Sequence, residues 1–71
     1  MKTRIRELRA ARRISQEELA RAVGTTRQTI TSIETEKYIA SLPLAYRIAR
    51  YFDLHIEEVF DLSEEENHEA L

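Results

Sequence analysis

The sequence predicts a single all-α domain built from five short helices. Only one glycine and one proline occur in 71 residues, so few positions would interrupt a helix. Apolar residues recur at spacings of three and four, which is the helical period. Serine, threonine or histidine stands before four of the predicted helices, where capping residues are expected. A chain of this length holds one domain at most, and its core is small.

The composition argues against several classes of protein. There is no cysteine, which excludes disulfides and thiolate metal sites and predicts a reducing, cytoplasmic compartment. No apolar run approaches the roughly 20 residues that span a bilayer, and the charged N-terminus is unlike a signal peptide. His55 and His68 are isolated, and no glycine-rich phosphate loop occurs. We therefore expect that the protein is not an enzyme and that it has no metal site, no cofactor and no membrane-spanning segment.

Charge is unevenly distributed along the chain. Residues 1–50 hold all 11 lysines and arginines but only five acidic residues, whereas residues 51–71 hold eight acidic residues and no Lys or Arg. A basic body suggests a polyanionic partner, although an ordinary surface of mixed charge would have the same balance. We expect residues 1–62 to form the folded domain and residues 63–71 to form an acidic, disordered tail.

The first two helices are predicted over residues 1–13 and after Ser15. Ile5 and Leu8 share one face of the first helix, and its other faces are strongly basic. Ser15 and Glu18 form a capping box, in which each side chain accepts from the other residue's backbone N–H. Gly24 ends the second helix, because the residue there must adopt a left-handed backbone, which costs free energy for any residue with a Cβ.

The third helix begins after Thr26 and ends near residues 35–36. Ile30 and Ile33 point towards the core. Thr29 lies near the boundary between the two faces. The outward face carries polar residues at helical spacing: Arg27, Gln28, Thr31 and Ser32.

Two more helices complete the predicted domain. Ser41 caps the fourth helix, in whose first turn Pro43 is tolerated. His55 caps a short fifth helix, with Leu54 and Val59 in hydrophobic-staple positions.

A helix, a tight turn with a glycine and a second helix with a polar outer face form a helix-turn-helix. In this motif the second helix enters the DNA major groove with its first residues against base edges. Arg27 could bond both acceptors of guanine, and Gln28 could pair with adenine. An ordinary solvated helix face would also be polar, but this face is short of the Lys and Glu typical of such a surface.

These residues resemble the lambda-repressor-like family of phage repressors and Cro proteins, and particularly its short prokaryotic regulators. The similar segments are Gln16–Ala20, Val23–Gly24, Arg27–Ile30 and Ile33–Glu34, within a resemblance that covers residues 2–60. The resemblance implies a compact five-helix domain, double-stranded operator DNA as ligand and a homodimer. It therefore implies a sequence-specific transcriptional regulator, and specifically a repressor, that inserts its third helix into the major groove.

The resemblance also assigns roles to individual residues. Residues expected to face bases are Arg27, Gln28, Thr29, Thr31 and Ser32, the last two more peripherally. Residues expected to contact the DNA backbone are Gln16, Thr26 and Lys37. Arg9 and Glu34 match a structural pair that ties the first helix to the third.

The chain departs from the family pattern where glycine is common. Arg13 and Glu36 occupy two such positions. A left-handed backbone there would cost roughly 1 kcal/mol each, unless the helices end differently. Glu36 also brings a negative charge near the expected DNA backbone.

Two further expectations concern protein partners. Small helix-turn-helix proteins also act as antitoxins, so an interaction protein that binds a toxin as well as DNA is the alternative function. For the homodimer, we expect an apolar patch near the C-terminal end of the domain, centred on Tyr51 and Phe60. The apolar residues from which the patch would be drawn are Tyr51, Leu54, Ile56, Val59, Phe60 and Leu62.

Overall fold

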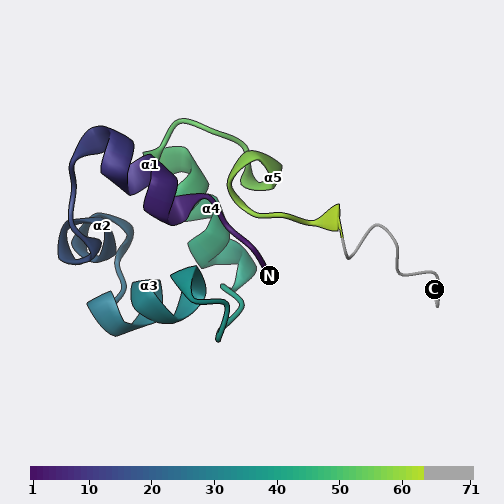
Figure 1. Cartoon of the computed structure of the whole chain (residues 1–71), viewed down its shortest axis with the longest axis horizontal. Helices are drawn as coiled ribbons and strands as arrows, with labels where there is room; N and C mark the ends of the chain where they lie inside the picture. Colours follow the sequence, from purple (N-terminus) through teal and green to yellow (C-terminus); the bar gives the residue numbers. More distant parts are fainter. Residues whose placement is uncertain (64–71) are drawn as a thin grey trace.

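A computed structural model describes residues 1–63, so the predicted acidic tail lies outside the described residues except for Ser63. It contains five helices, α1 (Ile5–Arg12), α2 (Gln16–Val23), α3 (Arg27–Glu34), α4 (Leu42–Tyr51) and α5 (Ile56–Val59) (Figure 1). The predicted all-α fold is confirmed. None of the helices within residues 1–63 has the length and apolar character needed to cross a membrane.

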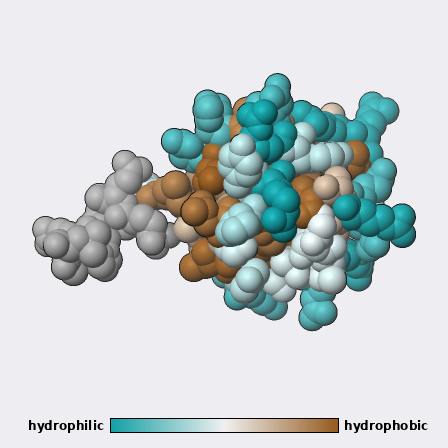
Figure 2. All heavy atoms as spheres, turned by 180° about the vertical axis from the view of Figure 1, so that it is seen from behind, coloured by the Kyte–Doolittle hydropathy of each residue, from teal (hydrophilic) through white to brown (hydrophobic). Residues whose placement is uncertain are grey.

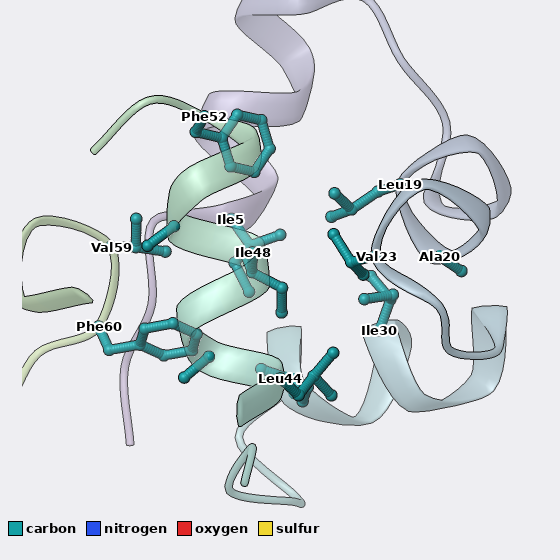
Figure 3. Packing of buried hydrophobic residues seen from close by; sticks show 13 residues of the cluster. Ile5, Leu19, Ala20, Val23, Ile30, Leu44, Ile48, Phe52, Val59 and Phe60 are labelled. Carbon is teal, nitrogen blue, oxygen red and sulfur yellow. The ribbon is translucent and has the colours of Figure 1, made fainter. Parts of the chain in front are cut away.

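The core is a single cluster of buried apolar side chains supplied by all five helices. Ile5 of α1 and Ile48 of α4 are fully buried in it. Figure 3 shows side chains of α2 and α3, among them Leu19, on one side of α4, with Val59 and Phe60 on the other side. The α4 helix is thus the element against which the rest of the domain packs.

Four helices each end in a separate turn of the same hydrogen-bonded type. Each turn contains one left-handed residue, and these residues are Arg13, Gly24, Glu36 and Asp53. At the end of α3, Glu36 has φ 65°, its N–H donates to Ile33 O at 3.1 Å, and Lys37 N–H donates to Ser32 O at 2.9 Å. This is the Schellman arrangement, which satisfies the last carbonyls of a helix. Arg13 and Glu36 therefore do adopt the left-handed backbone considered from the sequence.

The first helix is shorter than the sequence predicts. It begins at Ile5 rather than Met1, because residues 2–4 run antiparallel to residues 59–61 instead. This terminal clasp consists of a bridge between Thr3 and Phe60, a bond from Arg4 N–H to Val59 O and a bond from Asp61 N–H to Lys2 O, both 2.8 Å. The two ends of the described chain are thus joined through their backbones.

One titratable group in the clasp region is perturbed. Hydrogen bonds from the Ser63 side chain and backbone N–H lower the pKa of the Asp61 carboxyl, and the charge of Lys2 adds to this effect. The carboxylate form is therefore favoured beside the clasp.

The predicted apolar patch is wrong at its centre, Phe60, although Ile56 and Leu62 line an apolar groove together with Ile39 and Leu42. Phe60 and Val59 are only 3% and 1% exposed, because the clasp presses this segment into the core. The other four residues, Tyr51, Leu54, Ile56 and Leu62, are partly buried against the same cluster. The most exposed large aliphatic residues are instead Ile39 and Leu42. Figure 2 shows apolar atoms gathered next to the place where the described chain ends.

Candidate nucleic-acid interface

The α2 and α3 helices are joined by a turn of three residues. Gly24 ends α2 with φ 78°, and the Thr26 hydroxyl accepts from Thr29 N–H at 3.2 Å to begin α3. The expected Ser15–Glu18 capping box is present at the start of α2. In Figure 1, α3 lies along one edge of the molecule beside α2, so its outer face is available to a large ligand.

A buried carboxylate fixes the position of α3. The Glu34 side chain is 1% exposed and accepts from Arg9 Nε at 2.6 Å and from Arg9 Nη2 at 3.1 Å. Gln16 Nε2 also donates to it at 3.0 Å, and Gln16 Oε1 accepts from the Thr31 hydroxyl at 3.1 Å. We call Arg9, Gln16, Thr31 and Glu34 the Glu34 brace. It ties α1, α2 and α3 together, and it contains the Arg9–Glu34 pair predicted from the resemblance.

The predicted base-facing residues fall into two groups. Arg27 and Gln28 are exposed on the outer face of α3, and Thr29 and Ser32 are partly exposed. Thr31 lies on the side that faces α2, where its hydroxyl donates to Gln16 and to the Arg27 carbonyl. A group on this side of the helix has less freedom to turn towards a base.

The predicted backbone-contacting residues lie at the two ends of this surface. Thr26 is exposed at the N-terminus of α3, and Lys37 is exposed just beyond its C-terminus. Gln16 is partly exposed, with one amide N–H given to Glu34. Its amide nitrogen carries a second N–H, which suits a phosphate oxygen at the α2 N-terminus.

Several arginines in residues 1–50 stabilise the fold by donating hydrogen bonds to backbone carbonyls. Arg4 donates to Glu58 O at 3.1 Å, and Arg47 donates to Val23 O at 2.8 Å. Arg12 donates to the carbonyls of residues 51 and 52 at the end of α4, at 3.0 and 3.1 Å. These arginines satisfy carbonyls at helix ends or in α5. The basic exterior predicted for the first helix is therefore only partly available to an anion.

Tyr38 is a surface residue that the sequence analysis did not single out. It is 50% exposed, and with residues of α3 it lines an open hollow of about 270 Å³. The residues that line the hollow are Thr26, Gln28, Thr29, Ser32 and Tyr38. Three of them are predicted to face bases. The available signal was an aromatic residue in the loop after the third predicted helix, but its position depends on the left-handed turn at Glu36.

Comparison with known proteins agrees with this geometry. The helix-turn-helix family profile matches residues 5–59. The chain belongs to the lambda-repressor-like helix-turn-helix family. An uncharacterized HTH-type transcriptional regulator of Archaeoglobus fulgidus is 53% identical over 66 residues, which cover 93% of each chain. The Bacillus subtilis regulator YgzD is 48% identical over 65 residues, 92% of this chain and 98% of its own. MJ0272 of Methanocaldococcus jannaschii, also named as an uncharacterized HTH-type transcriptional regulator, is 42% identical over 66 residues, 93% of this chain and 100% of its own.

Proposed function

We propose that this protein is a sequence-specific transcriptional regulator that inserts α3 into the major groove of operator DNA. The observation that carries the proposal is the Glu34 brace, which holds α3 at the edge of the domain with its polar face outward. A recognition helix must be held in this way if its side chains are to meet base edges in register. The family and the names of the relatives support the same function.

We assign direct base readout mainly to Arg27 and Gln28. Their side chains are exposed at the start of α3, and they match the bidentate patterns of guanine and adenine respectively. Thr29 and Ser32 contribute from the same hollow, and Thr31 contributes peripherally because its hydroxyl proton is engaged in the brace. We assign the DNA backbone to Gln16, Thr26 and Lys37. Such contacts position the protein without selecting a sequence.

We further propose that the protein acts as a homodimer and as a repressor. One such domain reads only about four or five base pairs, so two half-sites about one helical turn apart are needed for useful specificity. Ile39 and Leu42 are 63% and 72% exposed, and they border an apolar groove. The loop that carries Ile39 directly follows α3. A self-complementary contact there would therefore relate the two recognition helices by a two-fold axis. Occupancy of an operator by this dimer would be enough to repress.

The test of DNA recognition is selection of bound sequences from random duplex DNA, followed by competition binding of variants. Gln28→Ala should cost about 1–3 kcal/mol and relax preference at one base position. Lys37→Ala, at an exposed backbone-contacting residue outside the Glu34 brace, should weaken all sequences about equally. An unchanged preference profile for the Gln28 variant would contradict the assigned face, and failure to enrich any sequence would contradict the function.

The test of the dimer is sedimentation equilibrium at micromolar concentration without DNA. We expect a dimer that Leu42→Asp converts to a monomer, because a charge at the centre of an apolar contact is costly to bury. Tyr46→Phe, at a residue 57% exposed that does not line the groove, is the control. A dimer that survives Leu42→Asp would place the interface elsewhere. A wild-type monomer would rule out a dimer that forms without DNA, which leaves a dimer formed only on DNA or a different protein partner, as in the antitoxin alternative.

A further inference from the structure

The hollow beside α3 combines two segments that the sequence separates. Gln28 and Thr29 come from the first turn of α3 and Ser32 from its next turn, whereas Tyr38 comes from the loop beyond it. The hollow therefore lies on the same outer face as the proposed base-reading residues. It is open to solvent rather than part of the core.

The chain reversal at Glu36 is what brings Tyr38 to this place. Because Glu36 is left-handed and Lys37 N–H reaches back to Ser32 O at 2.9 Å, the chain turns back at the end of α3. Tyr38 then lines the hollow together with Ser32 of α3. Its side chain is 50% exposed and is not one of the buried core residues.

The threonines of the hollow already use their hydroxyls. Thr26 Oγ1 accepts from Thr29 N–H at 3.2 Å, and the two hydroxyls lie 3.0 Å apart and share a hydrogen bond. Each threonine also carries a methyl group and Tyr38 carries an aromatic ring, so the residues that line the hollow offer apolar carbons as well as polar groups.

A small apolar group that protrudes from the major groove is the ligand that fits this hollow. Thymine presents its C5 methyl group there, and apolar side chains recognise it. Gln28 lines the same hollow and matches the adenine edge. The hollow thus places an adenine-reading amide next to a site for a methyl group.

We infer that Tyr38 is a specificity-determining residue whose ring forms one wall of a site for the methyl group of thymine. This inference rests on the proposed insertion of α3 into the major groove. It adds that the loop after α3 reads a base, in addition to the recognition helix. The ring carries the effect, and the hydroxyl is not required.

The experiment uses the full chain and a duplex chosen by selection from random DNA. Each thymine of the duplex is replaced in turn by deoxyuridine, which removes only the methyl group. Wild-type protein should lose affinity about fivefold to tenfold at one thymine in each half-site. Tyr38→Ala should bind the unmodified duplex about tenfold more weakly and should be insensitive to that replacement, whereas Tyr38→Phe should behave like wild type. Tyr46→Ala is the control for loss of an exposed tyrosine ring on α4.

The outcomes separate this inference from the function on which it rests. If wild-type protein enriches no sequence, the proposed function fails. If wild-type protein binds a specific duplex but Tyr38→Ala binds it equally well, only the inference fails. The inference also fails if Tyr38→Ala remains as sensitive to deoxyuridine as wild type, since its ring would then not be the wall of the methyl site. Circular dichroism of each variant confirms that the fold is retained.

Discussion

The Glu34 brace and the terminal clasp both join distant parts of the chain, but they do so with different groups. The brace links α1, α2 and α3 through side chains that converge on one buried carboxylate. The clasp links residues 2–4 to residues 59–61 through backbone hydrogen bonds and a buried Phe60. The brace therefore depends on a few irreplaceable side chains, whereas most backbones could form the clasp.

This difference decides where substitutions matter. Removing one member of the brace leaves a charged or polar group buried without its partner, which is expensive. Removing an exposed side chain from the clasp, such as that of Lys2, leaves its backbone bonds in place. The brace also includes Glu34 and Thr31 of α3, so it sets the position of the helix that carries the proposed base-reading face.

The largest expected effect is that of Glu34→Ala. The side chain is 1% exposed and its partner Arg9 is 14% exposed, so the substitution leaves a largely buried guanidinium without its carboxylate. We expect the free energy of unfolding to fall by about 3–5 kcal/mol in urea titrations followed by circular dichroism.

The matched control is Glu17→Ala. Glu17 also pairs with an arginine, Arg21, at 3.3 Å, but both side chains are more than half exposed. Its removal should cost less than about 1 kcal/mol. Similar losses for both variants would show that the Glu34 brace is no stronger than a surface ion pair.

The same contrast explains what could be predicted from the sequence. Capping residues and the spacing of apolar side chains indicated all five helices, and the family motif supplied the Arg9–Glu34 pair. The predicted start of the first helix was wrong, because residues 2–4 form backbone hydrogen bonds with residues more than 50 positions away. Backbone bonds of this kind leave no pattern of side chains in the sequence. The burial of Phe60 follows from the same pairing, so Phe60 could not be the centre of the expected apolar patch.

The site was predictable to a similar extent. Helical spacing places Arg27, Gln28 and Ser32 on the outward face, where the structure has them exposed or partly exposed. Thr31 shares that spacing, but the neighbouring α2 helix engages its hydroxyl. Tyr38 could not be placed, because its position follows from a left-handed residue that is not glycine.

A second, smaller effect is expected when the clasp is shortened. A variant that starts with methionine in front of Arg4 lacks two hydrogen bonds, the one from Asp61 N–H to Lys2 O and the one from Ile5 N–H to the Thr3 hydroxyl. It should lose about 1–2 kcal/mol, since each such bond contributes about 0.5–1.5 kcal/mol. Hydrogen exchange followed by NMR should show faster exchange at the Asp61 amide relative to the global unfolding rate.

The helices of the brace serve as the internal reference in that experiment. Amides of α2 and α3 should lose only the protection that the global loss of stability explains. If they instead lose protection as strongly as Asp61, the clasp and the brace would form one cooperative unit rather than two.

The smallest expected effect concerns the left-handed helix ends beside each region. Glu36 ends the helix that carries Glu34, and Asp53 lies before α5 and the clasp. Replacing Glu36 with glycine should raise stability by about 1 kcal/mol, or about 4–8 °C in a thermal melt of a domain this small. Asp53→Gly should gain less, because aspartate tolerates this backbone better than glutamate does.

Gly24→Ala provides the reverse measurement, because it places a Cβ on a left-handed residue. No atom lies within 4 Å of the added Cβ there, so its cost is that of the backbone alone. If Glu36→Gly gained nothing while Gly24→Ala destabilised, interactions of the Glu36 side chain would offset its backbone strain, and the turn that positions Tyr38 would depend on that side chain.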